Sequence, residues 1–434
     1  MKCFSKILFI IVDGARFDIF SDLLEKGRLP AIKKYVAERG CFLRARTVFP
    51  SVSGPACLAM WTGKHPAVLG IPGLRWMDRE IFRRFPLHPF AFRSYVGPGI
   101  SMMKKDISPT KSLFTVFRKN SAIFPMAEMK GLKNVTAKIQ MGVTLTARLS
   151  RVWKIADDIA GMFLVREVSR GVQLVVCTFP GIDELAHLLT PFHGKVIEEY
   201  ERVDRWIGKA MKIMEGKGIL DETLIVVTSD HGLSETATHI DLDSIAERQL
   251  GGVLAYPKLT PGRIFKPHCA VMTSGNAMSH VYFKGKNGWG ERVCLEEMKR
   301  LYGRLLDELE KMEGISMLVA KGENGRIYRF KPQQNSWVEM DENDFLYDEI
   351  EPVFKCNRSG DLIVIARNGY DLRAKWFEIP PHRASHGGID DEHMNIPLAL
   401  SFPAPPHLST PPSTLDLFPA LLSALRSPLL PELI

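Results

Sequence analysis

Four short runs of apolar residues constrain the fold of this chain more than any other feature of its sequence. They are KILFIIV (6–12), VQLVVCTF (172–179), LIVVT (224–228) and IPLALSF (396–402). Because apolar and polar residues do not alternate within them, the runs are typical of strands buried on both faces of a mainly parallel sheet. Helical patterns lie between them, at 18–39, 196–215 and 295–312. The alternation predicts a doubly wound α/β fold, with a mainly parallel sheet sandwiched by helices.

The length of the chain, 434 residues, exceeds the roughly 250–300 residues at which one hydrophobic core stops growing. We therefore expect a large core that carries insertions. The core is assigned to 1–75, 151–239 and 381–434. Two stretches that interrupt the strand–helix rhythm are assigned to an insertion near the active site (76–150) and to a second insertion or cap subdomain (240–380). Both are expected to cover the carboxyl ends of the strands, where such sheets bind ligands.

The charge balance says little about the partner. Hydrophobic residues (45%) and charged residues (24%) occur at the frequencies of a packed soluble protein, which excludes intrinsic disorder. The formal net charge is +8, but the basic residues are scattered along the chain. The charge alone therefore does not distinguish a nucleic acid, an anionic membrane surface and an acidic substrate.

The cysteines and the apolar segments bear on the compartment. The seven cysteines include no C-x-x-C pair and are odd in number, which favours a reducing compartment over a disulfide framework. No apolar run reaches the roughly 18–20 residues of a membrane span. The amino-terminal segment shows no signal-peptide cleavage site. We therefore expect a soluble cytoplasmic protein without a membrane span.

Acidic and histidine side chains cluster at or near the ends of the apolar runs. They are Asp13, Asp183, His187, Asp230, His231 and His386. Mixed Asp and His ligands suit borderline divalent metals such as zinc. Asp183 and His187 are four residues apart, so a helical turn presents both on one face. Asp230 and His231 are adjacent, and the glycine after them permits a turn that brings both to one metal. Six ligands are enough for two metals with positions left open for a substrate.

A candidate nucleophile lies in the segment TVFPSVSGPACLAMWTG (47–63), which is rich in turn residues and leads into a predicted helix. Ser53 would lie at or just before the amino terminus of this helix, where free N–H groups and the helix dipole favour an anion. A metal-bound hydroxyl there could ionise near neutral pH and attack phosphorus or sulfur. The alternative is that Ser53, or Ser51, is a helix N-cap. The candidate ligands favour the nucleophile.

Five motifs span nearly the whole chain. They are IIVDG (10–14), FPSVSGPACLAMWTGKHPAVLGIPG (49–73), PGIDELAH (180–187), TSDHG (228–232) and SHGG (385–388). In this order they resemble the type I phosphodiesterase/nucleotide pyrophosphatase group of the alkaline phosphatase superfamily. The resemblance implies an alkaline phosphatase-like core and a metal-dependent phosphoric ester hydrolase.

Roles then carry over residue by residue. The resemblance implies that the metal that activates the nucleophile is bound by Asp13, Asp230 and His231, with Ser53 as a further contact. It implies that the second metal is bound by Asp183, His187 and His386. Ser53 matches the nucleophile position, where the group usually has threonine. The implied mechanism is an in-line displacement at two divalent ions, Zn²⁺ in the first place and Mn²⁺ as an alternative, through a covalent phospho-serine intermediate that water hydrolyses. The implied partner is an anionic small-molecule phosphoester, with nucleotides among the candidates.

The chain also departs from the group. The group usually has an asparagine just after its G-I motif, which helps to hold a phosphoryl oxygen, but Leu74 stands at that position. Leucine cannot donate a hydrogen bond, so we expect Arg75 or a backbone N–H to replace this contact; a plain surface cation is the alternative role of Arg75. Sulfatases have an arginine where this chain has Cys57, which argues against sulfatase activity. Phosphoglycerate mutases and phosphopentomutases share the metal set but differ around the nucleophile.

The sequence leaves three classes of function to be distinguished. The first is a phosphodiesterase or nucleotide pyrophosphatase, with a phosphomonoesterase or phosphonate hydrolase of the same superfamily as the alternative. The second is a non-catalytic metal-binding homologue, which Leu74 favours and the complete ligand set opposes. The third is a nucleic-acid-binding protein, which only the net charge supports. No recognisable nucleic-acid motif is present, so we expect no specific nucleic acid binding.

Other polar residues have weaker claims to a role. His239, Asp241 and Asp243 are candidates for a further metal or lid site, and a solvated loop is the alternative. Residues that would line the cleft from the second insertion are Ser274, Asn276 and His280. Two histidines near His386 could be confused with it, His382 and His393, and the glycines that follow His386 favour it as the ligand.

Overall fold

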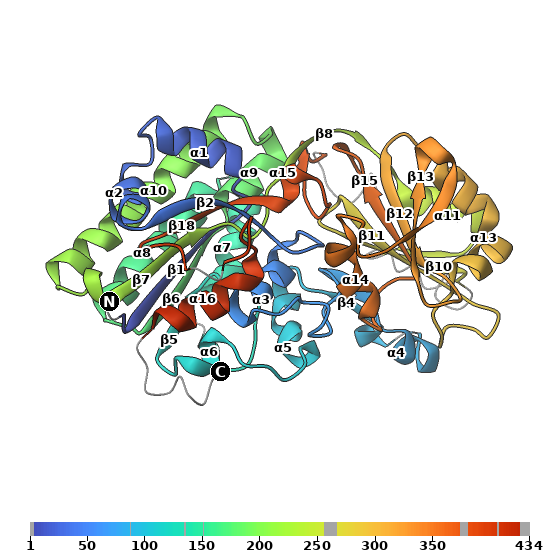
Figure 1. Ribbon diagram of the computed structural model, residues 1–434, viewed down its shortest axis with the longest axis horizontal. Helices are drawn as coiled ribbons and strands as arrows, with labels where there is room; N and C mark the ends of the chain where they lie inside the picture. The colour runs from blue at the N-terminus through green and yellow to red at the C-terminus, as the bar shows by residue number, and fades with distance from the viewer. Residues whose placement is uncertain are drawn as a thin grey trace.

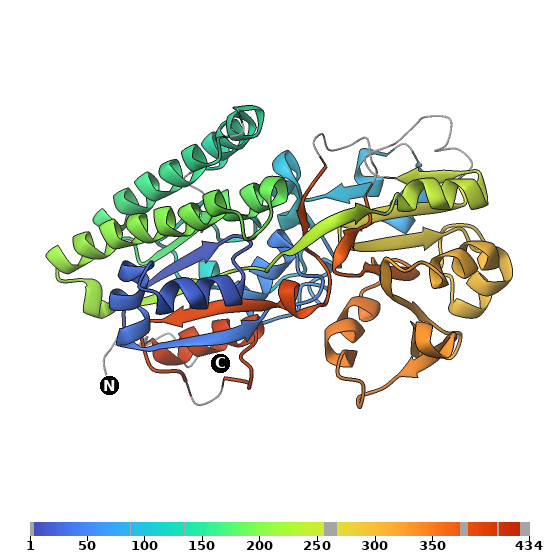
Figure 2. The same cartoon turned by 90° about the horizontal axis from the view of Figure 1, so that it is seen from above.

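The computed structural model describes residues 4–86, 88–133, 136–150, 152–255, 267–373, 381–405 and 408–425. Its two largest sheets belong to two units that lie side by side (Figure 1). The chain forms most of the first unit, crosses to the second along β8 (Ser234–His239), and returns to the first near its carboxyl end (Figure 2). We call the unit with the seven-stranded sheet the cap and the other unit the core.

The core is built on a six-stranded sheet with the order β2-β18-β7-β1-β6-β5. The strands are β1 (Lys6–Val12), β2 (Cys41–Arg46), β5 (Asn120–Ile123), β6 (Leu174–Phe179), β7 (Thr223–Thr228) and β18 (Asn395–Leu400). The pairs β7–β1, β1–β6 and β6–β5 are parallel. Every residue of β6 and β7 is buried, as expected for strands that are covered on both faces. The predicted α/β fold with a mainly parallel central sheet is confirmed.

One strand of the core runs against the others. β18 pairs antiparallel with both β7 and β2, although its apolar run was expected to join a mainly parallel sheet. The chain returns from the cap at the edge of the sheet where β1, β6 and β7 end, so β18 begins at that edge. Two backbone hydrogen bonds fix this start: Gly232 N–H donates to His393 O (2.8 Å) and Thr47 N–H donates to Met394 O (2.9 Å).

Helices cover both faces of the core sheet. One face packs against α1 (Phe17–Glu25), α2 (Pro30–Tyr35), α7 (Ala137–Ser150), α8 (Lys154–Ser169), α9 (Gly181–Leu189) and α10 (Gly194–Gly216). The other packs against α3 (Ser53–Thr62), α5 (Met103–Asp106), α6 (Leu113–Val116) and α16 (Leu417–Ala424). Within β1, Leu8 and Ile10 belong to the first apolar cluster and Phe9 and Ile11 to the second. Both sides of the strand are therefore buried, which explains its unbroken apolar sequence.

The cap is built on a seven-stranded sheet with the order β14-β13-β12-β15-β11-β10-β9. The strands are β9 (Val253–Ala255), β10 (Cys269–Ser274), β11 (Met278–Phe283), β12 (Ile315–Lys321), β13 (Ile327–Lys331), β14 (Ser336–Met340) and β15 (Leu362–Ala366). Its pairs are antiparallel except β9–β10. One face packs against α11 (Leu242–Leu250) and α13 (Leu295–Glu310), and the other against α14 (Tyr347–Lys355).

Smaller elements lie between and beside the two sheets. A two-stranded sheet consists of β3 (Arg75–Met77) and β4 (Phe92–Ser94), and α4 (Arg79–Arg84) lies between them in the chain. A three-stranded sheet has the order β16-β8-β17, with β16 (Gly369–Asp371) and β17 (Ala384–Ser385), and α15 (Asp391–Met394) precedes β18. No helix among the described residues is both long and apolar enough to cross a membrane.

The range 76–150, assigned from the sequence to one insertion, contributes to both units in the structure. Its last part supplies β5 to the core sheet and α7 to the helices that cover it. β5 is only four residues long, NSAI, so it lacks the long apolar run by which the other core strands were recognised. Its first part contacts the cap, since the buried Arg79 forms an ion pair with Asp361 (2.7 Å).

Candidate metal centre

The six candidate ligands predicted from the sequence meet at the carboxyl edge of the core sheet, and all six are buried. Asp13 follows β1, and Asp230 and His231 follow the neighbouring strand β7. Asp183 and His187 lie on α9, the helix that begins directly after β6. Parallel strands end at the same edge of a sheet, so these loops and this helix converge. His386 reaches the same edge because it lies just upstream of the antiparallel strand β18.

The first set of ligands comprises Asp13, Asp230 and His231. His231 Nε2 lies 3.6 Å from Asp13 Oδ1 and 3.7 Å from Asp230 Oδ2. Asp230 Oδ1 accepts hydrogen bonds from the N–H groups of Gly14 (3.3 Å) and His231 (3.1 Å), which orients the carboxylate. Gly14 adopts a φ of +71°, and a Cβ there would lie 2.9 Å from Asp183 Cβ. The glycine of the IIVDG motif is thus required both by its conformation and by the close approach of the second set.

The second set of ligands comprises Asp183, His187 and His386. Asp183 Oδ2 lies 3.3 Å from His187 Nε2, one helical turn away, and Asp183 Oδ1 lies 4.0 Å from His386 Nε2. The helix that was predicted to place Asp183 and His187 on one face is present. Ligand atoms of Asp183, His187 and His386 all lie within 4.8 Å of one another, and so do those of Asp13, Asp183 and His231. Asp183 therefore lies between the two sets, which the sequence did not indicate.

The three histidines share an arrangement that is typical of metal ligands. Each ring directs Nδ1 at a backbone carbonyl: His187 at Ala384 O (2.7 Å), His231 at Gly232 O (3.1 Å) and His386 at Ser51 O (3.1 Å). A carbonyl only accepts hydrogen bonds, so Nδ1 carries a proton, and in the neutral ring this leaves the lone pair on Nε2. Histidines that bind metals through Nε2 are held in this way by the other nitrogen.

The carboxylates also fit a cation. Asp13 Oδ1, Asp183 Oδ1 and Asp230 Oδ2 are buried and have no hydrogen-bond partner. A buried carboxylate oxygen without a partner is costly unless a charge or a metal compensates it. Together with the three Nε2 atoms they form a set of oxygen and nitrogen donors of the kind that zinc and manganese bind. The residues present therefore fit divalent metal ions.

The pKa shifts within the cluster also fit a site for divalent cations. Burial raises the pKa of Asp13, and the nearby carboxylates of Asp230 and Asp183 raise it further. Burial would also raise the pKa of Asp183, but His187 and the other imidazoles hold it well below its ordinary value. Burial tends to lower the pKa of His187, and Asp183 outweighs this and raises it to about 9. A divalent cation would favour the carboxylate of Asp13 and the neutral imidazole of His187, the forms that bind metal.

Ser53 is the first residue of α3, and its side chain is half-buried at the edge of the cluster. Its Oγ lies 3.1 Å from His231 Nε2. The first hydrogen bond of the helix runs from Ala56 N–H to Val52 O (3.0 Å), so the N–H groups of Ser53 and Gly54 precede the helical ladder. The serine hydroxyl therefore lies at a helix amino terminus and beside a candidate ligand.

Neither Ser53 nor Ser51 is the N-cap of α3. The N-cap residue of α3 is Val52, and no side chain caps the helix. Ser51 Oγ instead donates to Gly388 O (2.7 Å) and accepts from Gly387 N–H (3.2 Å). Ser51 thus ties the loop before α3 to the loop that carries His386.

Leu74 and Arg75 lie at the border of core and cap. Leu74 is half-buried and packs against an apolar cluster to which both core and cap contribute. The Arg75 guanidinium donates to Thr273 O (2.8 Å), and Arg75 N–H donates to Ser274 Oγ (3.0 Å). In this structure the side chain of Arg75 is thus bound to the cap strand β10, and its predicted contact with a phosphoryl oxygen stays a prediction.

The weaker candidates are mostly structural. His239 pairs with Asp371 (2.8 Å), and Asp241 caps α11 by accepting from Ser244 N–H (3.1 Å). The buried His393 contacts Ser234 Oγ (2.7 Å), and burial lowers its pKa to about 3. His280 is buried and contacts Pro72 O (3.1 Å).

His382 was singled out only because it could be confused with His386. In the structure its ring stacks on that of His187, with ring centroids 4.3 Å apart. The sequence signal that could have found this contact is its position four residues before His386 in HRASH (382–386).

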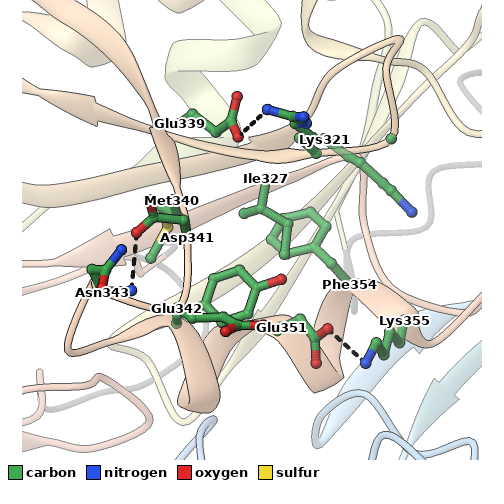
Figure 3. A pocket seen from close by; sticks show the side chains of 13 residues that line it. Lys321, Ile327, Glu339, Met340, Asp341, Glu342, Asn343, Glu351, Phe354 and Lys355 are labelled. Carbon is green, nitrogen blue, oxygen red and sulfur yellow. Dashed lines mark hydrogen bonds and ion pairs between the residues drawn. The ribbon is translucent and has the colours of Figure 1, made fainter.

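The cap also contains a pocket of about 420 Å³ between β12, β13, β14 and α14 (Figure 3). Ion pairs flank it, Arg326 with Glu339 and Lys355 with Glu351 (each 2.6 Å). None of the candidate ligands lines this pocket. It is therefore separate from the metal centre.

The chain matches one protein family in sequence and resembles several solved enzymes in fold. The family described as type I phosphodiesterase/nucleotide pyrophosphatase matches residues 7–388. Phosphonoacetate hydrolase from Sinorhizobium meliloti 1021, solved with phosphonoacetate, superposes with a TM-score of 0.61 at 16% identity over 98% of this chain and 96% of that chain. Murine ectonucleotide pyrophosphatase/phosphodiesterase 5 gives 0.61 at 16% identity over 96% and 94%, and the human protein gives 0.59 at 14% over the same shares. A search of curated protein sequences finds no match.

Proposed function

The chain belongs to the type I phosphodiesterase/nucleotide pyrophosphatase family, and from that premise we propose that it cleaves phosphodiester or nucleotide pyrophosphate bonds at a centre of two divalent ions. It is a hydrolase of phosphoester bonds. The observation that carries the proposal is the convergence of Ser53 Oγ, three imidazole Nε2 atoms and three unpaired carboxylate oxygens at one edge of the sheet.

In this proposal each metal has its own ligands. Asp13, Asp230, His231 and Ser53 would hold the first ion, and Asp183, His187 and His386 would hold the second. The donor set suits Zn²⁺, with Mn²⁺ as the alternative. When bound, the ions supply Lewis-acid stabilisation of the phosphoryl oxygens and lower the pKa of a hydroxyl in the site.

The chain's own residues then carry out two displacements. Ser53 Oγ attacks the phosphorus in line with the leaving oxygen: the Oγ–P bond forms, the bond from phosphorus to the leaving oxygen breaks, the serine proton passes to solvent and the leaving oxygen takes up a proton. Water next attacks the phospho-serine: its oxygen forms a bond to phosphorus, the Oγ–P bond breaks, water gives up a proton and Ser53 Oγ takes one up. The N–H groups of Ser53 and Gly54 at the start of α3 favour the anionic phosphoryl group in both steps.

A phosphonate hydrolase or phosphomonoesterase is the second candidate function. A neighbour in structure is a phosphonoacetate hydrolase, and another, murine ectonucleotide pyrophosphatase/phosphodiesterase 5, was solved with AMP in an inactive form. Leu74 at the usual asparagine position also weakens the parallel with nucleotide pyrophosphatases. We propose an anionic small-molecule phosphoester as substrate and Arg75 as a contact to its phosphoryl oxygen.

The cytoplasm is proposed as the compartment. The six cysteines in the described part of the chain are free thiols, which is consistent with a reducing environment.

Replacing the nucleophile tests the proposed function. Ser53→Ala should lower kcat on bis(p-nitrophenyl) phosphate by about 10³-fold or more, because the attacking oxygen is lost. Its metal content, measured by mass spectrometry, should change little. Ser53→Thr should keep most of the wild-type rate, since threonine is the usual nucleophile of the family. Full activity of Ser53→Ala with the metals bound would overturn the proposal.

Substrate comparison separates the two candidate functions. Turnover is measured on bis(p-nitrophenyl) phosphate, p-nitrophenyl phosphate and phosphonoacetate at equal concentration. The proposed phosphodiesterase should be fastest on the diester. A preference for the monoester or the phosphonate would favour the second candidate, and binding of less than one metal equivalent with no turnover would favour a non-catalytic homologue.

A further inference from the structure

The turn between β10 and β11, residues 274–277, is the part of the cap that reaches the metal centre; we call it the cap turn. Gly275 and Asn276 adopt φ values of +62° and +68°. Glycine adopts this left-handed conformation freely, and asparagine adopts it more readily than most residues. The turn is therefore tight, and Gly275 and Asn276 face the core.

The backbone of the cap turn is bonded to the ligand His386. His386 N–H donates to Gly275 O (3.1 Å), and Ala277 N–H donates to His386 O (3.0 Å). The approach leaves no room for side chains: a Cβ at Gly275 would lie 2.9 Å from His386 Nδ1, and a Cβ at Gly387 would lie 2.6 Å from Ser274 O. The cap turn and the loop of His386 thus form one bonded unit.

The side chain of the same turn reaches His382, whose ring lies against His187, the other histidine of the second set. Asn276 Nδ2 donates to His382 Nδ1 (3.2 Å). The His382 ring stacks on the ring of His187 at 4.3 Å, with 28° between the planes. Around His187 the chain adds two hydrogen bonds, from Arg383 N–H to His187 O (2.7 Å) and from His187 Nδ1 to Ala384 O (2.7 Å). The segment 382–386 therefore encloses His187 and also carries His386.

The hydrogen bonds described above for the first set of ligands do not involve the cap. Asp230 is oriented by Gly14 and His231, and His231 by Gly232, all from loops of the core sheet. The His386 ring also stacks on the ring of His231 (centroids 3.8 Å), so the two halves touch, but the hydrogen bonds from the cap turn run to His382 and His386 and not to the loops of the first set.

We infer that Asn276 and His382 are positioning residues through which the cap turn fixes the two histidines of the second metal. This inference rests on the proposed two-metal site. It makes the cap a determinant of the second metal's affinity, while the first metal is held by the core alone. Contacts that orient a metal-binding histidine typically change metal affinity by about 10- to 100-fold.

Metal titration of the full chain tests the inference. Zn²⁺ is titrated into the metal-free protein by calorimetry, and Co²⁺ binding is followed by its visible absorption spectrum. Asn276→Gly keeps the left-handed turn but removes the amide, and His382→Phe keeps a ring for stacking but removes the hydrogen bond. Asn335→Gly is the matched control, because Asn335 is also left-handed (φ +45°) but lies in the loop between β13 and β14.

In the expected result, wild type and Asn335→Gly bind two ions. Asn276→Gly binds the first ion with unchanged affinity and the second about 10-fold or more weakly, and His382→Phe does the same to a smaller extent. Excess Zn²⁺ then restores the rate of Asn276→Gly, which general unfolding would not allow. If both variants bind two ions like wild type, or lose both ions equally, the inference is wrong and the proposed function stands. If wild type binds fewer than two ions, the proposed function fails as well.

Discussion

The two halves of the candidate metal centre are supported in different ways. Asp13, Asp230 and His231 follow two adjacent parallel strands, and their hydrogen bonds stay within the loops of the core. His187 and His386 are enclosed by a segment that is bonded to the cap. The geometry of the first half thus follows from the register of one sheet, whereas that of the second also requires the correct docking of two units. If the proposed two-metal assignment is correct, a mutation in the cap should affect the second metal more than the first.

The largest expected effect comes from removing one histidine from each half of the centre. His231→Ala should lower kcat by about 10⁴-fold or more, because it removes both a proposed ligand of the first metal and the partner of Ser53 Oγ. His187→Ala should leave the first metal bound and lower kcat by about 10²- to 10³-fold. Steady-state kinetics and metal content measured together separate the two. His239→Ala serves as the control, since His239 pairs with Asp371 away from the ligands. Equal loss of both metals in both variants would show that the halves are not independent.

Arg75 tests whether the border between the units also contributes to substrate binding. Arg75→Ala should lower kcat/KM by about 10- to 100-fold, since a hydrogen bond to a charged group contributes roughly 1.5–3 kcal/mol. Both metals should remain bound. If kcat/KM stays within twofold of wild type, Arg75 only anchors β3 to Thr273 O, as the present geometry shows.

The smallest expected effect is a change in thermal stability on substituting Asp157, which supports α9 within the core. Asp157 is buried, and its Oδ1 accepts from Gly181 N–H (3.0 Å) at the start of the helix that carries Asp183 and His187. Burial raises the pKa of Asp157 well above its ordinary value, and Glu199 raises it further, although Gly181 N–H and Arg202 oppose this. A carboxyl with a raised folded-state pKa stabilises the fold most below its unfolded pKa, and this contribution is lost as the pH rises toward the folded-state value.

Asp157→Asn should therefore change the stability of the core without altering metal binding. The asparagine keeps the acceptor for Gly181 and removes the titration, so Tm should exceed that of wild type by about 1–3 °C at pH 8 and by less at pH 5. Thermal unfolding at the two pH values measures this, and Glu199→Gln provides a second variant at the same pair. A larger gain at pH 5 than at pH 8 would contradict the assigned direction.

The sequence predicted the first half of the centre more completely than the second. Strand-end residues such as Asp13 and Asp230 were located because unbroken apolar runs end beside them, and Asp183 and His187 because their spacing fits a helix. His386 was placed by its motif alone. The orientation of β18, which brings His386 to the site, depends on where the chain returns from the cap and has no local signal.

Contacts between the two units could not be predicted. Asn276 is about a hundred residues from His382, and neither lies in a repeating pattern that relates one to the other. Arg75 was expected near the substrate from its place in a motif, but its hydrogen bond to Thr273 O depends on how the cap docks. Likewise β5 was missed because a four-residue strand carries too few apolar positions to show a period.

Anomalous diffraction at the zinc edge, from crystals of the full chain grown with Zn²⁺, would locate the metals themselves. We expect two peaks, one bounded by Asp13, Asp230 and His231 beside Ser53, and one bounded by Asp183, His187 and His386. A single peak, or a peak whose ligands lie outside these residues, would contradict this expectation.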